Sequence, residues 1–309
     1  MKSVNYAGAI LLSLISYSAL AYRQPVHMHL TDAALSQSVL SDGAIWNTWG
    51  VGKETPFLFQ QTIVDFPHVI VNSKMSYQEL FKYGVDAEDT NEGVTQLAAT
   101  GGNTTGWNRA FNHFFNPQAD KKLDLFGIWQ NDKSPVWSLE TAMSTGEAHT
   151  IGYQNFSYTD AQEYYYMAFA APTAAERNLN MGKMFQTLGH VIHHIQDMAQ
   201  PEHTRLDKHI DKPIILTIEG LVGSDDSSIY EEYTNDMLNC GALVTTPIDP
   251  NNPTVDCPIA NKTSWNGVFK TKKVNIAGYP IPMFNTPYEF WHTADARGLA
   301  DFSSRNFIT

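Results

Sequence analysis

One stretch of the sequence, LGHVIHHIQDMAQPEHTR at residues 188–205, most constrains the fold, because it holds four of the eleven histidines in the chain. Placed on a helix that begins near residue 181, with about 100° per residue, its polar and apolar residues separate onto opposite sides. The polar arc consists of His190, His193, His194 and Asp197, and the apolar side consists of Met184, Leu188, Val191, Ile192 and Ile195. A solvated stripe usually carries Lys and Glu, so a stripe of histidine and aspartate favours a metal site.

The spacing within this stretch strengthens the metal interpretation. His193 and Asp197 stand four residues apart, so on a helix they direct two ligand atoms toward one point. Pro201 then ends the helix and His203 follows, which gives the pattern H-x3-D-x5-H. The competing interpretation is a histidine-rich surface turn, or core histidines that are satisfied by hydrogen bonds.

Helical periodicity recurs along the chain and predicts a mainly α fold with long irregular connections. Helices are predicted over residues 29–40, 76–83, 160–170, 174–198, 230–238 and 293–306. Period-2 alternation is confined to residues 62–71 and 268–281, and residues 101–106 and 247–253 have loop composition. Loops of this length need a metal or a disulfide to hold them. The aromatic run YYYMAF at residues 164–169 is expected to pack in the core rather than to face lipid.

The N-terminus, MKSVNYAGAILLSLISYSALA, has the features of a signal peptide. Lys2 precedes an apolar run over residues 7–15, and Ala19 and Ala21 are placed like an A-x-A cleavage site. The alternative, an uncleaved anchor, is disfavoured because the run is shorter than the roughly 20 residues of a membrane span. We therefore expect residues 1–21 to be removed and residues 22–309 to form one exported domain, periplasmic or extracellular, with no transmembrane segment.

Charge and cysteine content narrow the class of protein further. The formal net charge of −12 gives the chain no general attraction for nucleic-acid phosphates. The two cysteines, Cys240 and Cys257, are expected to form a disulfide in an exported protein. In the chain-entropy model that bond is worth roughly 3 kcal/mol. Zinc ligation by this pair is the weaker interpretation, because no CxxC spacing is present.

The segment HHIQDMAQPEH resembles the central motif of the zinc-dependent phospholipase C family, which shares its fold with the S1/P1 nucleases. Further pieces follow in the family's order across most of residues 22–306. They are HLTDAAL with His29, GVDAEDTNEG with Asp89, NHFFNP with His113, SSIYEEY with Glu231, and GLADFSSRNF, which is similar to a later helix of bacterial members. Only the central match is specific alone, and the ordered combination carries the resemblance.

The resemblance implies a single helical domain of the phospholipase C/P1 nuclease type, built around three zinc ions. The implied ligands of the first zinc are Asp89, His113, His193 and Asp197. Those of the second are His29, Asp197 and the α-amine and carbonyl of the first mature residue, Tyr22. Those of the third are His203, Glu231 and one further histidine. Histidine and carboxylate suit zinc, and paired metals can clamp a phosphodiester. Asp89 has a second implied role, to orient or deprotonate the attacking water.

The chain departs from the family's pattern at three places. The family usually has tryptophan where this chain has Tyr22. The family's histidine four residues before the zinc glutamate aligns with Ser227, for which His209 is the best substitute and Asp225 or Asp226 the next. The family also continues beyond the last matched helix, so two alternatives are expected: the C-terminal region that ends at Thr309 is shortened, or the chain is a fragment.

Several neighbouring residues stand as alternatives to the implied ligands. His27 competes with His29, although the HLT context favours His29, and Asp86 or Glu88 replaces Asp89 if the register slips. His190 and His194 are expected to support the ligand histidine rather than to bind metal.

The implied function is that of a secreted zinc phospholipase C. It would hydrolyse phospholipids such as phosphatidylcholine at a membrane or micelle surface, giving diacylglycerol and a phosphorylated head group, and it would act as a monomer. A single-strand nuclease is the first alternative, disfavoured by the lack of a Gly-Gly-Asn run shortly after His203. A non-catalytic, metal-stabilised secreted binding protein is the second. Ser227 favours that second alternative, and the near-complete ligand set opposes it.

Overall fold

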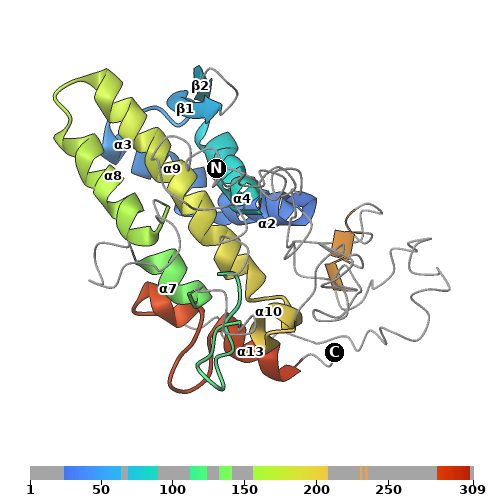
Figure 1. Ribbon diagram of the computed structural model, residues 1–309. Coiled ribbons are helices and arrows are strands. Elements are labelled where there is room, and N and C mark those ends of the chain that lie inside the picture. Colours follow the sequence, from blue (N-terminus) through green and yellow to red (C-terminus); the bar gives the residue numbers. More distant parts are fainter. Residues whose placement is uncertain are drawn as a thin grey trace, which may run out of the picture.

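The computed structural model describes residues 24–63, 69–89, 112–123, 132–140, 156–207, 230–231, 234–235, 238 and 284–306 (Figure 1). This part of the chain is mainly helical, as predicted. Its helices are α2 (Gln24–Gln37), α3 (Gly43–Trp49), α4 (Tyr77–Asp89), α7 (Ser134–Leu139), α8 (Tyr158–Ala170), α9 (Ala174–Asp197), α10 (Pro201–Arg205) and α13 (Leu299–Asn306), with short 3-10 helices η1 (Val39–Ser41) and η2 (Pro287–Phe290).

The longest helix, α9, forms the axis of the described fold. The Thr173 side chain caps its first turn by accepting a hydrogen bond from the backbone N–H of Glu176, and no proline interrupts it before Pro201 begins α10. Helix α8 runs beside it and begins with a capping box formed by Ser157 and Asp160. The helices predicted over 160–170 and 174–198 are therefore confirmed to within two residues at each end.

Two glycines let α4 press directly against α9. A methyl group on Gly84 would meet the carbonyl oxygen of Gln186 at 2.0 Å, and one on Gly189 would meet the carbonyl oxygen of Phe81 at 2.3 Å. No other residue type has room at either position, so the two backbones touch there. Figure 1 shows α4 beside the middle of α9, the part of the helix that leads into its histidines.

An aromatic core fills the space between α3, α4, α9 and the sheet. Phe185 lies at its centre, with ring contacts to Trp46, Phe57, Tyr77 and Phe81 at centroid distances of 5.2 to 6.0 Å. Burying one such side chain contributes about 1.5–3 kcal/mol, so this cluster fixes how the helices meet.

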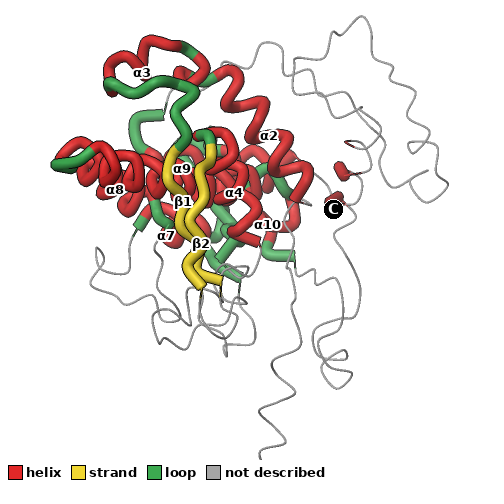
Figure 2. Tube along the Cα trace, turned by 90° about the horizontal axis from the view of Figure 1, so that it is seen from above, coloured by secondary structure: helices red, strands yellow, loops and turns green. Residues whose placement is uncertain are grey.

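The sheet within the described residues is a single antiparallel pair, β1 (Phe57–Ile63) and β2 (Val69–Met75), in which Ile63 pairs with Val69. The prediction of one strand over 62–71 is therefore wrong, because alternation alone does not mark where a chain doubles back. Figure 2, the view from above, shows the pair lying across one end of α4 and α9. That end is the one opposite to α10 in Figure 1.

Other boundaries also differ from the predicted ones. Helix α2 begins at Gln24 rather than His29, α4 continues to Asp89 rather than ending at Tyr83, and α13 covers less than the predicted 293–306. Of the helix predicted over 230–238, the described residues are helical. The signal peptide and the segments 101–106, 247–253 and 268–281 lie outside the described residues.

The aromatic run at residues 164–169 is not core, contrary to expectation. Ala168 is buried and Tyr164 is half-buried, but the remaining residues of the run, Tyr165, Tyr166, Met167 and Phe169, are exposed. The side chains of the run are apolar on nearly all sides of α8. Neighbouring elements cover only one side of this helix, so the rest of the run is exposed.

In the part of the chain that the structure describes, no helix combines the length and the apolar character that a membrane span requires.

Candidate metal centre

The polar arc of α9 faces inward rather than toward solvent. His190, His193, His194 and Asp197 are all at most 1% exposed. They lie against α2, α4 and the segment around His113. The glycine contact between α4 and α9 brings the side chains of these two helices close together. The polar residues that reach into this arc gather around two buried carboxylates, Asp197 and Glu88.

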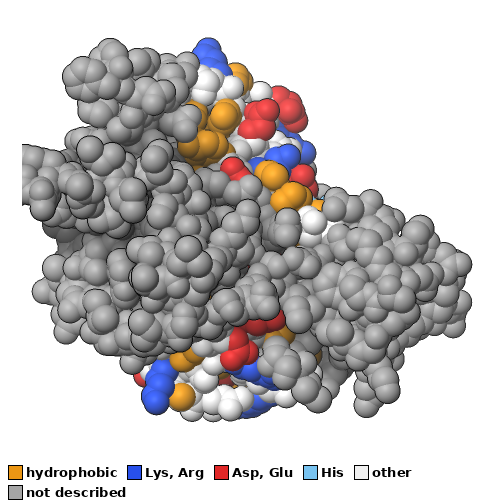
Figure 3. All heavy atoms as spheres, turned by 45° about the vertical axis from the view of Figure 1, so that its right-hand side comes forward, with side chains coloured by type: hydrophobic (Ala, Val, Ile, Leu, Met, Phe, Trp, Pro, Cys, Tyr) orange, Lys and Arg blue, Asp and Glu red, His pale blue; other side chains and the backbone are white. Residues whose placement is uncertain are grey.

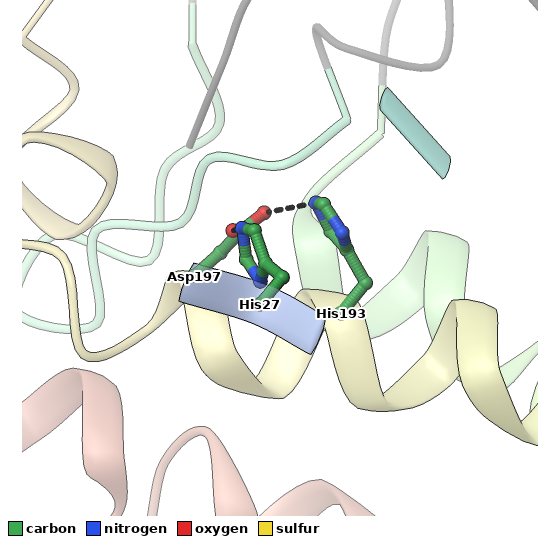
Figure 4. Close-up of side chains that lie close together, drawn as sticks. All are labelled: His27, His193 and Asp197. Atoms are coloured by element: carbon green, nitrogen blue, oxygen red, sulfur yellow. Dashed lines mark ion pairs between the residues drawn. The ribbon is translucent and has the colours of Figure 1, made fainter. Parts of the chain in front are cut away.

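Asp197 lies at the centre of the first group. His27 Nε2 lies 3.4 Å from Asp197 Oδ1, and His193 Nε2 lies 3.4 Å from Oδ2 (Figure 4). His113 Nδ1 and His203 Nδ1 lie 3.0 Å and 3.8 Å from Oδ2. The four imidazoles come from α2, the segment 112–123, α9 and α10, so the fold gathers them from positions up to 176 residues apart in the printed sequence.

Carbonyl oxygens fix the protonation of three of these rings. His27 Nδ1–H donates to Gln196 Oε1 at 2.7 Å, His193 Nδ1–H to the Val85 carbonyl at 2.8 Å, and His203 Nδ1–H to the His113 carbonyl at 3.1 Å. The Gln196 amide is held in turn, because its Nε2 donates to Thr31 Oγ1 at 2.9 Å. A carbonyl can only accept, so the proton sits on Nδ1 and each neutral ring keeps a lone pair on Nε2. Metal-binding histidines have this arrangement.

The Asp197 carboxylate itself is left for a cation. Among the described residues neither of its oxygens accepts a hydrogen bond of normal geometry, although both are buried. Asp197 is also the last residue of α9, where the helix dipole disfavours a negative charge. Burial alone would raise the pKa of Asp197, but the neighbouring His193, His113 and His203 outweigh burial and hold that pKa well below its usual range. The carboxylate is thus negative, and it faces the lone pairs of His27 and His193.

Glu88 lies at the centre of the second group and differs in its neighbours. His194 Nε2–H donates to Glu88 Oε1 at 2.8 Å, His190 Nδ1–H to Oε2 at 2.5 Å, and Trp137 Nε1–H to Oε1 at 3.3 Å. On the far side of His194, Ser134 Oγ lies 3.3 Å from Nδ1 and accepts a hydrogen bond from Trp291 Nε1 at 3.1 Å. Burial is the main reason that the pKa of His194 falls to about 4, so this ring is neutral near pH 7.

His113 joins the two groups. Its Nδ1 approaches Asp197, and its Nε2 lies 3.6 Å from Glu88 Oε1. Burial lowers the pKa of His113, but the Asp197 carboxylate and then Glu88 outweigh burial and raise the pKa to about 9. Backbone hydrogen bonds hold the segment in place, from Phe115 N–H to the His203 carbonyl and from Ser134 N–H to the Phe114 carbonyl.

These residues could hold metal ions. Two sets of three have ligand atoms within 4.8 Å of one another, His27 with His193 and Asp197, and Glu88 with His113 and His194. The first set fits a cation better, because its carboxylate accepts no hydrogen bond of normal geometry from the residues that the structure describes, and its two rings present lone pairs. In the second set the N–H groups already point at the carboxylate, so a metal there would have to replace existing hydrogen bonds.

Four of the predicted ligands come together in the structure. His113, His193 and His203 lie around Asp197, whereas the resemblance assigns His203 to a different zinc from the other three. Glu231 is buried beside the start of α10, where its Oε1 accepts a hydrogen bond from Gln200 Nε2 at 2.8 Å. The side chain of Asp89 and the residues Tyr22, His209, Asp225, Asp226, Ser227, Cys240 and Cys257 lie outside what the structure describes, so their roles stay predictions.

Two residues that the sequence analysis ranked second lie in the cluster. His27, rather than His29, reaches Asp197, while His29 is half-buried and its Nε2 has no hydrogen-bond partner among the described residues. Glu88 faces the α9 histidines and accepts a hydrogen bond from His194. The signal for His27 was its spacing from Thr31 and Leu35, which share its buried helical stripe.

Comparisons with protein-family models, with curated proteins and with solved structures find no match for this chain. The interpretation of the metal centre therefore depends on its own geometry and chemistry.

Proposed function

We propose that this chain is an exported, zinc-dependent phosphodiester hydrolase of the phospholipase C type. One observation carries the proposal: among the described residues Asp197 is a fully buried carboxylate without a hydrogen bond of normal geometry, and four imidazoles approach it to within 3.0–3.8 Å. Burying such a charge is costly, and a bound cation would offset that cost beyond what the ion pair with His113 provides.

Zinc suits this donor set better than the other common divalent cations. The ligand atoms are imidazole nitrogens and carboxylate oxygens, which zinc accepts, whereas magnesium and calcium prefer oxygen ligands alone. His27, His193 and Asp197 would hold one ion, and His113 and His203 lie close enough to complete or extend the set. When bound, zinc polarises a phosphoryl oxygen and lowers the pKa of water.

The protein's own residues would supply orientation. Gln196 and the Val85 carbonyl hold the His27 and His193 rings so that their Nε2 lone pairs face Asp197. The Glu88 hydrogen bonds fix His190 and His194 behind them. A site whose ligands are held in advance loses little entropy when a metal and a substrate bind.

The substrate class comes from the resemblance described above, not from the geometry. On that basis we propose a phospholipid such as phosphatidylcholine, with phosphorylated head group and diacylglycerol as products, and with cleavage of residues 1–21 before the protein acts outside the cytoplasm. A phosphodiester is the bond that paired metal sites of this composition hydrolyse.

The test is release of phosphocholine from phosphatidylcholine micelles by the chain that begins at Tyr22. The protein is stripped with a chelator, reloaded with zinc and assayed beside His193→Ala. His292→Ala is the matched control, because that histidine is half-buried outside the cluster and pairs with Asp301 at 2.8 Å. Bound zinc is counted in each sample by elemental analysis.

We expect zinc-dependent release from the wild type and from His292→Ala, and none from His193→Ala. Folded wild-type protein that binds no zinc would overturn the metal centre. Zinc-loaded protein that releases no phosphocholine would overturn the phospholipase assignment, and cleavage of single-stranded nucleic acid by the same sample would assign a nuclease instead.

A further inference from the structure

An exposed apolar surface lies at the end of α8, far from the metal centre. Tyr166 is 75% exposed, and Tyr165, Met167 and Phe169 are each 40–45% exposed. The turn into α9 continues this surface with small apolar residues, since residues 170–175 read AAPTAA. We call Tyr165, Tyr166, Met167, Phe169 and Trp49 the aromatic tip.

Trp49 joins the aromatic tip from a different element. Its ring, at the end of α3, lies 6.3 Å from Tyr165 and 6.4 Å from Phe169, and those two rings are 4.7 Å apart. The rings therefore form one contiguous patch rather than scattered exposed residues. Contiguous apolar surface of this kind marks an interaction site, whereas single exposed apolar residues do not.

The aromatic tip carries no charge. Between Tyr164 and Ala175 the sequence has no Asp, Glu, Lys or Arg, although the whole chain has a net charge of −12. Elsewhere the surface is mixed, and in the coloured part of the face in Figure 3 acidic and basic side chains lie among the apolar ones. The tip thus avoids both attraction to anionic lipid and repulsion from it.

We propose that the aromatic tip inserts into the surface of an uncharged or zwitterionic lipid bilayer. Trp and Tyr prefer the boundary between lipid and water, because one end of each ring is apolar and the other forms hydrogen bonds. Figure 1 shows the α8–α9 turn at one extremity of the part of the fold that the structure describes.

The aromatic tip is an anchor and not part of the metal centre. The tip member nearest to the cluster, Trp49, contacts Phe185, which precedes His193 by eight residues of α9, or about 12 Å. Changes at the tip should therefore alter attachment to lipid without altering the chemistry at Asp197. The inference stands on the tip alone and does not require the proposed phosphodiesterase activity.

The test is co-flotation of the chain from Tyr22 with vesicles of digalactosyldiacylglycerol, an uncharged bilayer lipid that has no phosphodiester. Binding is compared among wild type, Tyr166→Ser/Phe169→Ser and Tyr166→Ser/Met167→Ser. The second pair keeps the contacts of Phe169 with Trp49 and so guards against misfolding. Tyr288→Ser/Phe290→Ser is the matched control, because it removes a Tyr and a Phe of 36% and 43% exposure from η2.

We expect the wild type and the control to float with the vesicles, and both tip variants to bind at least about tenfold more weakly, from the apolar area removed. Addition of anionic lipid should not strengthen binding. Turnover of a soluble phosphodiester, where present, should be equal in all four proteins. Absence of vesicle binding, equal loss in the control, or a tip that instead drives dimerisation in sedimentation velocity would overturn the proposal. Because the lipid is no substrate, a failed phospholipase assignment leaves this result unchanged.

Discussion

Asp197 and Glu88 are both buried carboxylates beside the same helix, but apart from His113, which approaches both, their neighbours present opposite groups to them. Glu88 receives N–H groups from His190, His194 and Trp137, so its charge is dispersed by hydrogen bonds. Asp197 faces Nε2 atoms of His27 and His193 whose protons are on the other side of the ring. The difference teaches that histidine near a carboxylate is not enough to indicate a metal. What matters is whether the proton or the lone pair points inward.

The largest difference should appear when each carboxylate is replaced by its amide. Asp197→Asn should abolish stoichiometric zinc binding, because the anionic ligand at the centre of the set is lost. Glu88→Gln should keep the zinc but lower the free energy of unfolding by about 1–3 kcal/mol, since a buried hydrogen bond becomes unsatisfied. Elemental analysis and thermal unfolding of the two variants measure both effects. Zinc retained by Asp197→Asn and lost from Glu88→Gln would reverse the assignment.

The contact between α4 and α9 should affect both carboxylates together. Gly189→Ala puts a methyl group 2.3 Å from the Phe81 carbonyl, and we expect a destabilisation of about 3 kcal/mol from overpacking. Zinc affinity should fall as well, because the Val85 carbonyl that orients His193 moves with α4. Gly43→Ala is the control, since a methyl group there meets nothing within 4 Å. Equal melting temperatures for the two variants would show that the backbones do not touch as described.

A smaller effect should separate the two histidines of α2. His27→Gln should weaken zinc binding by at least about tenfold, by analogy with the loss of groups that support a metal. His29→Gln should leave the affinity nearly unchanged, because His27 is the residue that reaches Asp197. Competition with a chromogenic chelator gives both values. A larger loss in His29→Gln would restore the ligand that the sequence resemblance implies.

The smallest effect is a pH dependence of the metal-free protein. The pKa of His113 is raised to about 9, so its stabilising contribution is complete below its ordinary pKa of 6.5 and disappears as the pH rises through 9. The pKa of His194 is lowered to about 4, so its contribution is present above 6.5 and is lost as the pH falls through 4. Chelated protein should therefore melt at its highest temperature near pH 6.5.

His113→Gln tests which residue causes the alkaline limb of that profile. Without the imidazole, the melting temperature should no longer fall between pH 6.5 and pH 9, while the acidic limb should remain. A profile that keeps its alkaline limb in His113→Gln would assign the titration to another group.

The long helices could be predicted because their pattern repeats over many turns. Helix α9 shows this best, since its polar and apolar sides separate over more than twenty residues. The central ligands His193 and Asp197 follow from that pattern at once. Short helices and helix ends depend on tertiary contacts that local sequence does not contain, and there the predictions were less accurate.

The differences between the predicted and the observed site residues also come from tertiary contacts that local sequence does not contain. Helix α2 begins five residues before its predicted start, and this places His27 on the buried stripe with Thr31. Helix α4 continues beyond Tyr83 because the glycine contact with α9 supports it, so Glu88 shares a face with Phe81 and Val85. No periodicity could show that His113 and His203 meet, because they approach each other from different segments.

The hydrogen bond from Trp291 to Ser134 has a consequence for the order in which the protein is made. Trp291 is the outermost member of a series of polar contacts that continues through Ser134 and His194 to Glu88. Glu88, Ser134 and His194 are synthesised well before residue 291, so for part of the synthesis this series of contacts lacks its outermost member. Its last support arrives only after residue 291 has been made, and an ion bound earlier would lie in an incompletely supported site.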